Sequence, residues 1–281
     1  MSEFYNPEHY TPSRNPNGEY ETLSIKNEAN IDWLTLNRPE SLNSMSRTMM
    51  LELQHYFGQL YTNNEVRVVV LTGAGRGFCA GLDLKEDLSD EPRGPVAGMR
   101  LQRRVSEIML RMRRAPQPII ALLNGPTSGG GFGLALASDI RIASPKIKMN
   151  AAFIRIGLTA CDVGVSYFLP RLVGSSLASE MLLTGNFITA ERALSVGLIS
   201  NIVARDKLNE AGREMAESIT RNSPIGVRLT KECLNISVDA SSLEAVVAME
   251  DRQQILVAQT GDMKEGVSAF MGKREPEYLD K

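Results

Sequence analysis

The sequence predicts an α/β fold made of repeated β-β-α units. Two apolar segments, residues 66–71 and 118–125, have the near-continuous composition of strands that are buried on both faces of a sheet. Amphipathic helical patterns alternate with these strands along the chain, and such alternation is typical of α/β architectures. Beyond Asn201 strand patterns become rare and helical patterns follow one another. We therefore expect an α/β core that is followed by a smaller helical region.

The first elements of the core can be assigned in chain order. Residues 20–37 are expected to form two strands around a turn at residues 27–30. A helix is predicted over residues 46–60, because apolar residues recur there on one face at helical spacing. Its N-cap is expected to be Ser44 or Ser46, since a serine hydroxyl can accept a hydrogen bond from the first turn.

A second helix is predicted over residues 99–114, with apolar residues on one side and four arginines on another. Such arginines are more typical of a solvated helix face than of a phosphate clamp. The strand at residues 118–125 leads into the glycines at residues 129–133 and then into the apolar segment 134–144. In the helical region, residues 243–257 carry an amphipathic helical pattern.

Three regions are predicted along the 281 residues. Residues 1–20 are polar and contain proline, without the apolar segment of a secretory signal or the Arg- and Ser-rich pattern of a transit peptide, so we expect a mobile N-terminal extension. Residues 21–205 are expected to form the core and residues 206–281 the helical region. The apolar faces of that region exceed what an isolated helical appendage needs and predict an oligomer interface.

The composition excludes several classes of function. Lysine and arginine number 31 and aspartate and glutamate 33, a net charge of -2, so the chain has no long-range field for nucleic acid or an anionic membrane. No window approaches the ~18 apolar residues of a membrane span. Of the two histidines, His9 lies in the polar tail, which leaves only His55 for chemistry that needs imidazole. Serine–histidine triads and histidine-rich metal sites are therefore disfavoured.

The three cysteines, Cys79, Cys161 and Cys233, are widely separated and lack C-x-x-C spacing. We therefore expect reduced thiols in a cytoplasmic protein, with no disulfide framework and no metal site. Cys161 is interpreted as a packing residue rather than a nucleophile, because no positive neighbour in the sequence would activate its thiol.

Two glycine-containing turns follow the predicted buried strands. They are VVVLTGAGRGFCAGLDLKE at residues 68–86 and IIALLNGPTSGGGFGLALASD at residues 119–139, and each is predicted to lead into a helix. Glycines let backbone N–H groups approach a ligand, and a helix N-terminus adds the positive end of its dipole. The alternative is that these glycines only permit close packing or positive φ angles.

Dinucleotide binding is one function of such turns, and the spacing disfavours it. Cys79 stands at the last glycine position of a T-G-x-x-x-G-x-G turn, no Y-x-x-x-K follows, and Leu134 replaces the last glycine of G-x-G-x-x-G. The G-x-x-x-x-G-K-[ST] and G-x-S-x-G motifs are absent as well. The other function is that both turns direct N–H groups at one carbonyl oxygen that becomes negative during a reaction, which needs no histidine.

Several segments of the chain together resemble one family. FCAGLDLKE precedes NGPTSGGGFGLALASDIRIAS by about fifty residues, with LNRPESLNSMS upstream and LPRLVGSSLASEMLLTGNFITAERALSVGLISNIV and EGVSAFMGKREP downstream. In this order and at this spacing they resemble the crotonase, or enoyl-CoA hydratase/isomerase, superfamily over about residues 20–275. The resemblance is highly specific for the family and less specific for the reaction.

The resemblance implies a crotonase-like spiral of β-β-α repeats with a helical C-terminal trimerisation region, as a homotrimer or a dimer of trimers. An acyl-CoA thioester would be the substrate, with no additional cofactor and no nucleic-acid or membrane partner. The N–H groups of Leu82 and Gly130 would bind the oxyanion. The other substrate contacts implied are Ala80, Asp83, Leu84 and Lys85 on the adenine and pantetheine side, Arg38 and Leu42 near the CoA nucleotide, Phe153 in the acyl pocket, Gly131 and Gly133, and Phe270 and Lys273 from the same or a neighbouring subunit.

Two of these residues, Arg38 and Asp83, and one further residue, Asp139, have structural alternatives. Arg38 is equally well interpreted as a solvated arginine at the end of the hairpin. Asp83 and Asp139 have family counterparts, and for both we favour a structural role in capping backbone N–H groups.

Two departures from the family pattern concern the catalytic acids. Typical members use two glutamates, one to poise a water molecule and one to protonate the α-carbon. The first follows the glycine triplet by two positions, where this chain has Gly133. The second lies four residues before Gly157, where this chain has Phe153. Both expected acids are absent.

Asp162 is the acid that remains nearby in the sequence. Its segment ACDVG resembles the A-A-D-V-G of dienoyl-CoA isomerases, in which the aspartate acts in shuttling a proton. The alternative is that Asp162 is an N-cap or loop aspartate hydrogen-bonded to the backbone.

Three functions remain open. The first is an acyl-CoA enzyme of the hydratase/isomerase type, in which the oxyanion site stabilises a thioester enolate and Asp162 moves the proton. Its acyl pocket would be apolar and suit a long or bulky group, because Phe153 is accompanied by Met149, Ile154 and Ile156. The second is a non-catalytic acyl-CoA-binding protein. The third is another crotonase reaction, such as thioester hydrolysis or carbon–carbon cleavage.

Overall fold

The main sheet has six strands in the order β1-β2-β3-β4-β6-β9. The structure is a computed structural model that describes residues 19–86 and 94–280. The β1-β2 hairpin is antiparallel and the other neighbours are parallel. The strands are β1 (Leu23–Glu28), β2 (Ile31–Leu36), β3 (Val68–Gly73), β4 (Ile119–Leu123), β6 (Ile140–Ala143) and β9 (Asn201–Ile202).

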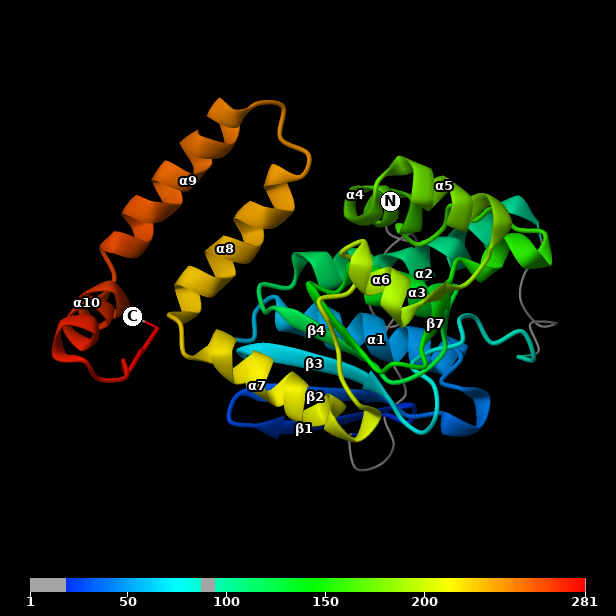
Figure 1. The fold of residues 1–281 in the computed structure, drawn as a ribbon, viewed down its shortest axis with the longest axis horizontal. Coiled ribbons are helices and arrows are strands. Elements are labelled where there is room, and N and C mark those ends of the chain that lie inside the picture. The colour runs from blue at the N-terminus through cyan, green and yellow to red at the C-terminus, as the bar shows by residue number, and fades with distance from the viewer. Residues whose placement is uncertain (1–18, 87–93, 281) are drawn as a thin grey trace.

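Both faces of this sheet are covered by helices, as the apolar composition of β3 and β4 predicts (Figure 1). On one face, α7 (Leu208–Thr220) packs against β3, β4 and β6 through Leu208 and Ala216. The other face packs against α1 (Arg47–Leu60), α2 (Pro95–Arg114) and α3 (Gly130–Ala137). All five residues of β4 are buried, which explains why its sequence shows no alternation of polar and apolar residues.

A second sheet of three short strands brings the two glycine turns together. Its strands are β5 (Thr127–Ser128), β7 (Lys148–Asn150) and β8 (Ile188–Thr189), in the order β5-β7-β8. The first turn extends this pairing, because Cys79 N–H donates to the Pro126 carbonyl at 3.2 Å and Ser128 N–H to the Cys79 carbonyl at 3.0 Å. Helices α4 (Val165–Val173), α5 (Ser175–Thr184) and α6 (Ala190–Ser195) follow in the same part of the molecule (Figure 1).

Most helices predicted from the sequence are confirmed, with small shifts at their ends. Helix α1 is capped by Ser46, whose hydroxyl oxygen accepts a hydrogen bond from the Met49 N–H at 3.2 Å. Helix α2 begins at Pro95, four residues before the predicted start. The apolar segment 134–144 divides between α3 and β6.

One predicted helix is wrong. The turn after β3 was expected to lead directly into a helix, but residues 74–86 form turns and isolated β-bridges, with bridges from Cys79 to Thr127 and from Leu82 to Met45. These bridges hold the backbone of residues 79–83 extended and so prevent it from winding into a helix. Among the described residues, α3 begins inside the second glycine turn, at Gly130, whereas the next helix after the first turn is α2, which begins at Pro95.

Helices α8 (Pro224–Ser237), α9 (Leu243–Ala258) and α10 (Gly261–Gly272) extend away from the core (Figure 1). We call residues 224–280 the C-terminal arm. No residue of α9 is buried, and several large apolar side chains of the arm are more than half exposed. The predicted helical character of this region is confirmed, although α7 packs on the sheet, and the boundary after residue 205 stays a prediction. The exposed side chains are Leu234, Leu243, Ile255, Leu256, Val267, Phe270, Met271 and Leu279.

A buried lysine joins the C-terminal arm to the core. Lys231 of α8 is 6% exposed and lies 2.8 Å from the carboxylate of Asp139, which follows α3. Its ammonium group also donates to the carbonyl of Gln117 at 2.7 Å, and Asp139 accepts a hydrogen bond from the Ile119 N–H at 2.8 Å. Asp139 therefore has a structural role, as the sequence interpretation has it.

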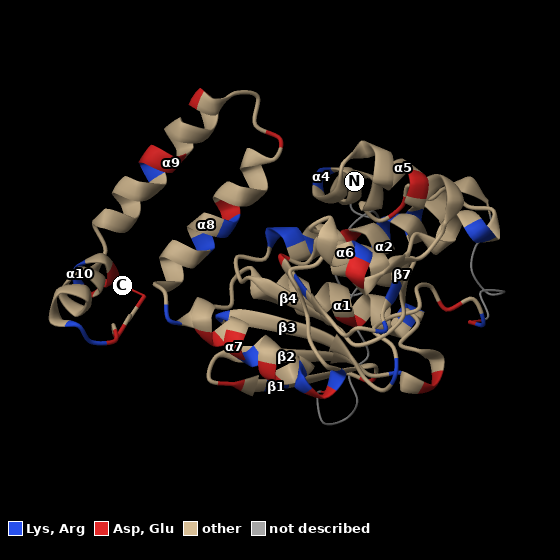
Figure 2. Ribbon diagram, in the orientation of Figure 1, with Lys and Arg blue, Asp and Glu red and all other residues tan. Residues whose placement is uncertain are grey.

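Charged residues of both signs occur on the core and on the arm (Figure 2). No helix within residues 19–86 and 94–280 is long and apolar enough to cross a membrane.

Candidate active site

A cavity of about 150 Å³ lies between the two glycine turns, α2 and residues 152–163. Four large apolar side chains that line it remain exposed: Leu82 at 41%, Leu84 at 67%, Ile156 at 54% and Leu158 at 52%. Exposed apolar side chains that gather around a concave site mark a surface for an apolar ligand. The only polar side chains among the described lining residues are Gln102 and Asp162.

The two glycine turns touch each other at the wall of this cavity. A β-carbon on Gly81 would lie 2.9 Å from the carbonyl oxygen of Ser128 and 3.5 Å from the Cα of Gly129. The φ angles of Gly81 and Gly129 are 99° and 53°, a region that residues with a side chain rarely adopt. Close packing and positive φ thus explain both glycines, and the same close approach brings Leu82 and Gly130 to one cavity.

Leu82 and Gly130 each present a backbone N–H without a partner. Gly130 is the first residue of α3, so its N–H has no acceptor within the helix. Leu82 lies between two backbone hydrogen bonds, from Met45 N–H to the Gly81 carbonyl at 2.7 Å and from Asp83 N–H to the Met45 carbonyl at 3.1 Å. Within the described residues neither the Leu82 nor the Gly130 N–H donates a hydrogen bond. The residues that line the cavity therefore include two whose N–H groups have no acceptor among the described residues.

Asp162 lies in the same cavity wall. Its Oδ1 accepts hydrogen bonds from the Val163 N–H at 2.7 Å and from the side-chain amide of Gln102. The N-cap of α4 is Gly164, and no side chain caps that helix. Asp162 is thus not a helix cap, although it does accept one backbone N–H. It is the only titratable side chain among the described residues that line the cavity.

Phe153 forms an apolar part of the wall. It lies in the 3₁₀ helix Ala152–Ile156, and its ring edge would be 3.5 Å from a β-carbon on Gly129. Ile156 lines the cavity with it, whereas Met149 is buried in β7 and Ile154 lies against Gly185. The predicted apolar pocket therefore contains Phe153 and Ile156 but neither Met149 nor Ile154.

Gly131 and Gly133 do not line the cavity, although both were predicted to contact substrate. A β-carbon on Gly131 would lie 2.2 Å from the carbonyl oxygen of Cys79. A β-carbon on Gly133 would lie 2.6 Å from Cγ2 of Val163 and 3.0 Å from Cε of Met109. Both glycines are packing positions inside α3, and Val163 takes the space that a side chain at residue 133 would need.

Arg38 and Asp83 bind each other. Their side chains form an ion pair at 2.8 Å, and the Arg38 guanidinium also donates to the Ser44 carbonyl at 2.7 Å. Burial raises the pKa of Asp83, but hydrogen bonds from Arg38, the Lys85 N–H and Ser44 outweigh it and hold that pKa below its ordinary value. Arg38 is therefore neither a solvated arginine nor an unpaired cation for the CoA nucleotide, and Asp83 has the structural role.

The remaining predicted contacts near the first turn divide into two groups. Ala80 and Leu84 line the cavity. Leu42 and Lys85 do not line it. Leu42 packs on Gly77, where an added β-carbon would lie 3.3 Å from Leu42 Cδ2. The Lys85 N–H donates to the Asp83 carboxylate at 3.1 Å.

Phe270 and Lys273 lie at the end of α10, and neither lines the cavity of its own chain. Phe270 is 82% exposed. In Figure 1 α10 lies beyond α8 and α9, on the far side of the arm from the core. The prediction that these residues complete the pocket from the same or a neighbouring subunit stays a prediction.

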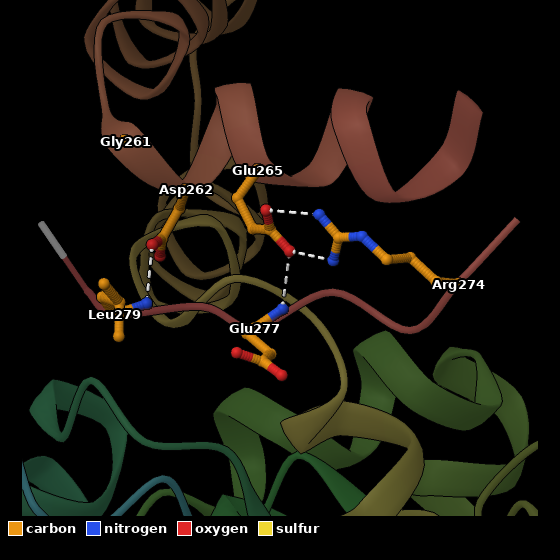
Figure 3. A pocket seen from close by; sticks show the side chains of 6 residues that line it. All are labelled: Gly261, Asp262, Glu265, Arg274, Glu277 and Leu279. Carbon is orange, nitrogen blue, oxygen red and sulfur yellow. Dashed lines mark hydrogen bonds and ion pairs between the residues drawn. The ribbon is translucent and has the colours of Figure 1, made fainter. Parts of the chain in front are cut away.

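A larger pocket of about 450 Å³ lies in the C-terminal arm, but its polar groups bind one another (Figure 3). Arg274 donates two hydrogen bonds to Glu265, at 2.5 and 2.8 Å, and the Glu277 N–H donates a third at 2.9 Å, which together hold the pKa of Glu265 at about 2. Asp262 accepts from the Leu279 N–H at 2.9 Å. These contacts fasten the C-terminal segment to α10.

Cysteine and metal chemistry find no support at the cavity. Burial raises the pKa of the Cys79 thiol to about 12, which disfavours the reactive thiolate. Cys161 is exposed, so the interpretation of Cys161 as a packing residue is wrong. Among the residues that the structure describes, no three His, Cys, Asp or Glu side chains cluster as a metal site requires.

Residues 26–281 match the model of one protein family, Enoyl-CoA hydratase/isomerase. The chain belongs to this family. The sequence prediction of the crotonase superfamily is thereby confirmed, and the chain is an acyl-CoA enzyme of the enoyl-CoA hydratase/isomerase type.

Relatives of this enoyl-CoA hydratase/isomerase agree along nearly the whole chain. A probable enoyl-CoA hydratase of Mycobacterium bovis is 42% identical over 256 residues, 88% of each chain. The 1,2-epoxyphenylacetyl-CoA isomerase of Escherichia coli is 36% identical over 90% of this chain and 97% of its own. A crystal structure of a putative enoyl-CoA hydratase from Streptomyces coelicolor superposes with a TM-score of 0.89 at 31% identity, covering 96% of this chain and 98% of that one. The predicted crotonase-like α/β fold is confirmed.

Two residues at the site escaped the sequence reasoning. Gln102 lies on α2, sixty residues before Asp162, and no sequence pattern links the two residues. Val163 has a φ of 42°, which its β-branched side chain gives no reason to expect. The ACDVG motif did point to the position of Val163 but not to its conformation.

Proposed function

We propose that this member of the family is an acyl-CoA isomerase that moves a proton between two carbons of an unsaturated acyl-CoA thioester. The observation that carries the proposal is the content of the cavity. It combines two N–H donors that have no partner among the described residues, at Leu82 and Gly130, with one carboxylate, Asp162, in a wall that is apolar apart from Asp162 and Gln102.

The N–H groups of Leu82 and Gly130 would bind the thioester carbonyl oxygen. When a proton leaves carbon, the electron pair of the C–H bond moves toward this oxygen and forms an enolate. Donors that are already in place stabilise that charge more than the neutral carbonyl, and each contributes about 3–4 kcal/mol to the rate. The substrate pocket therefore lowers the barrier without a metal or a positively charged side chain.

Asp162 would accept the proton from one carbon and return it to another carbon of the same conjugated system. The C–H bond breaks, the double bond shifts, and a new C–H bond forms with the proton that Asp162 carries, which can exchange with solvent before it is transferred, so that one proton is removed and one is returned. One acid/base group is sufficient for this exchange. Hydration in typical family members uses two glutamates, and this chain has Gly133 and Phe153 at those positions.

The substrate class follows from the wall of the cavity. Phe153, Ile156, Leu158 and Leu84 provide an apolar surface, so we infer an acyl group with an unsubstituted hydrocarbon or aromatic chain. A relative named 1,2-epoxyphenylacetyl-CoA isomerase supports isomerisation of an aromatic acyl-CoA as the type of reaction.

The test is a panel of 2-enoyl-, 3-enoyl- and 3,5-dienoyl-CoA esters in D₂O, followed by NMR. We expect a shift of the double bond with deuterium at the exchanged carbon. Asp162→Asn should lower kcat at least about a hundredfold, the lower range of general acid–base catalysis. Asp206→Asn, an exposed aspartate away from the cavity, should match the wild type.

Other outcomes would identify the competing functions. Binding of acyl-CoA without exchange or isomerisation would favour a non-catalytic binding protein. Release of free CoA would favour thioester hydrolysis, and a water adduct would favour hydration. Full activity of Asp162→Asn would refute the assignment of the proton carrier.

We also infer that the active enzyme is a homotrimer. The exposed apolar side chains on α9 and α10 support this inference, as does Phe270, which is 82% exposed and does not line the cavity of its own chain. Association through these helices would remove the apolar surface from water.

A further inference from the structure

We infer that Gln102 of α2 is a positioning residue that holds one oxygen of Asp162 and leaves the other oxygen to carry the proton. The inference rests on the proposed role of Asp162 as the proton carrier. It adds a residue from a separate element to the reaction and assigns the two carboxylate oxygens to different tasks.

The hydrogen bonds of Asp162 are unequal. Oδ1 accepts both the Gln102 amide and the Val163 N–H, whereas Oδ2 accepts no hydrogen bond from any described residue. Hydrogen bonds stabilise negative charge on the oxygen that accepts them. Oδ1, which accepts two hydrogen bonds, is therefore the weaker base. Oδ2 is the oxygen that is free to take a proton from carbon.

Gln102 reaches the site from α2, independently of the loop that carries Asp162. Gln102 and Asp162 are the only polar side chains among the described lining residues of the cavity. An ionised Asp162 carboxylate has no proton to donate, so the Gln102 carboxamide can only donate a hydrogen bond to it. The pair therefore fixes the rotation of the Asp162 carboxylate relative to the cavity.

Val163 supplies the second constraint through its backbone. Its N–H donates to Asp162 Oδ1 at 2.7 Å, and its φ of 42° is exceptional for a β-branched residue. The strained conformation is held by packing, because Val163 is 4% exposed and lies over Gly133 of α3, in the space where a side chain at residue 133 would be. Strain of this kind persists where the surroundings over-determine the backbone, and it clusters at functional sites.

Gly133, Val163 and Gln102 together fix the position of the Asp162 carboxylate. Gly133 leaves room for Val163, Val163 turns its N–H to Asp162, and Gln102 completes the pair of donors on Oδ1. The loss of the family glutamate at residue 133 and the use of Asp162 are therefore linked physically.

A pH profile of kcat can report on the hydrogen bonds that Asp162 accepts. No other described lining residue of the cavity is titratable. A general base must be ionised to act, so a change in the acidic limb of kcat between the wild type and a Gln102 variant would report on the Asp162 carboxylate.

The experiment compares wild type with Gln102→Leu and Gln102→Glu on whichever acyl-CoA ester the wild type isomerises. Gln102→Leu removes the donor, so kcat should fall about tenfold at neutral pH, the effect of one hydrogen bond to a charged group, with KM nearly unchanged. Its acidic limb should move to higher pH by roughly one unit. Gln102→Glu should move that limb further, because a second carboxylate disfavours ionisation of the first.

The controls separate this inference from the proposed function. Arg103→Leu changes the neighbouring exposed residue of α2, which does not line the cavity, and should leave the pH profile unchanged. Gln102 is itself exposed, so both variants should retain the melting temperature of the wild type. An inactive Asp162→Asn together with a Gln102→Leu that keeps the wild-type kcat and acidic limb would overturn the role of Gln102 alone. A fully active Asp162→Asn would overturn both.

Discussion

Gly133 lacks a side chain in a place where the neighbouring loop has filled the space. A β-carbon there would come within 2.6 Å of Val163 and 3.0 Å of Met109, both of which are buried. We expect Gly133→Ala to lower the free energy of unfolding by about 1–3 kcal/mol, the usual cost of overpacking a core. Chemical denaturation at one protein concentration would measure it.

A matched glycine tests whether packing is the cause. Gly226 of α8 also lies in a helix, but its β-carbon would have only ordinary contacts, the closest at 3.7 Å. Gly226→Ala should therefore be neutral or slightly stabilising. Adding Val163→Gly to Gly133→Ala should recover part of the lost stability, and a Gly133→Ala protein as stable as the wild type would contradict the packing argument.

At the residue scale, site residues that belong to a local sequence motif could be predicted. Contacts between residues that are distant in the sequence could not. Leu82, Gly130, Asp162 and Phe153 lie in one cavity because each is fixed by a local turn that the family pattern describes. Gln102 joins them through the packing of α2, which no local pattern encodes. Arg38 was predicted near CoA from its motif, but its actual partner, Asp83, is determined by how two loops meet.

At the scale of elements, α8 is held to the core by a buried ion pair. Burial lowers the pKa of Lys231 even though Asp139 favours its charged form, so the ammonium depends on its close partners. Lys231→Met would leave the carbonyls of Met112 and Gln117 without this donor and Asp139 without its closest cation. We expect a loss of about 3 kcal/mol in the free energy of unfolding, as for other broken buried pairs.

Lys207 is the matched control for Lys231. It forms an ion pair of the same length, 2.8 Å, with Glu210, but its side chain is 63% exposed. Lys207→Met should change the stability by less than about 0.5 kcal/mol, because exposed pairs contribute little. Equal effects of the two substitutions in thermal denaturation would show that burial of Lys231 is not what stabilises α8.

The strands and helices of the core could be predicted because their buried positions require apolar residues, and these recur with the period of the element. The five buried residues of β4 are apolar throughout, and Ser46 is a preferred N-cap that begins α1. The helix expected after the first glycine turn failed for a different reason. Residues 79–83 are held extended by bridges to Thr127 and Met45, partners that are distant in sequence and leave no local signal.

At the scale of the whole molecule, the apolar surface of the arm predicts association. Ile255 and Leu256 of α9 are 61% and 60% exposed, more than an isolated helix in water would favour. We expect light scattering to find trimers for the wild type. Leu256→Glu should shift the protein toward monomers, whereas Leu183→Glu, at an apolar residue of α5 that is 79% exposed, should leave it trimeric. A monomeric wild type at micromolar concentration would remove the trimer from the proposal.

The separation of Phe270 from its own cavity makes a further prediction about how active sites are shared. If Phe270 acts at the cavity of a second copy, each site uses Asp162 from one chain and Phe270 from its neighbour. Asp162→Asn and Phe270→Ala homotrimers should then both lose activity. Each variant carries the residue that the other lacks, so a mixed trimer can assemble an intact site.

Random mixing of the two variants in equal amounts, by refolding or co-expression, should restore about a quarter of the wild-type sites, because each cyclic site draws its two residues independently from the mixture. Mixing each variant with itself is the control and should restore none. Recovery would place Phe270 at the partner's cavity. An unchanged, inactive mixture that is verified as hybrid trimers by mass spectrometry would instead confine Phe270 to the interface and leave each cavity to be completed by its own chain.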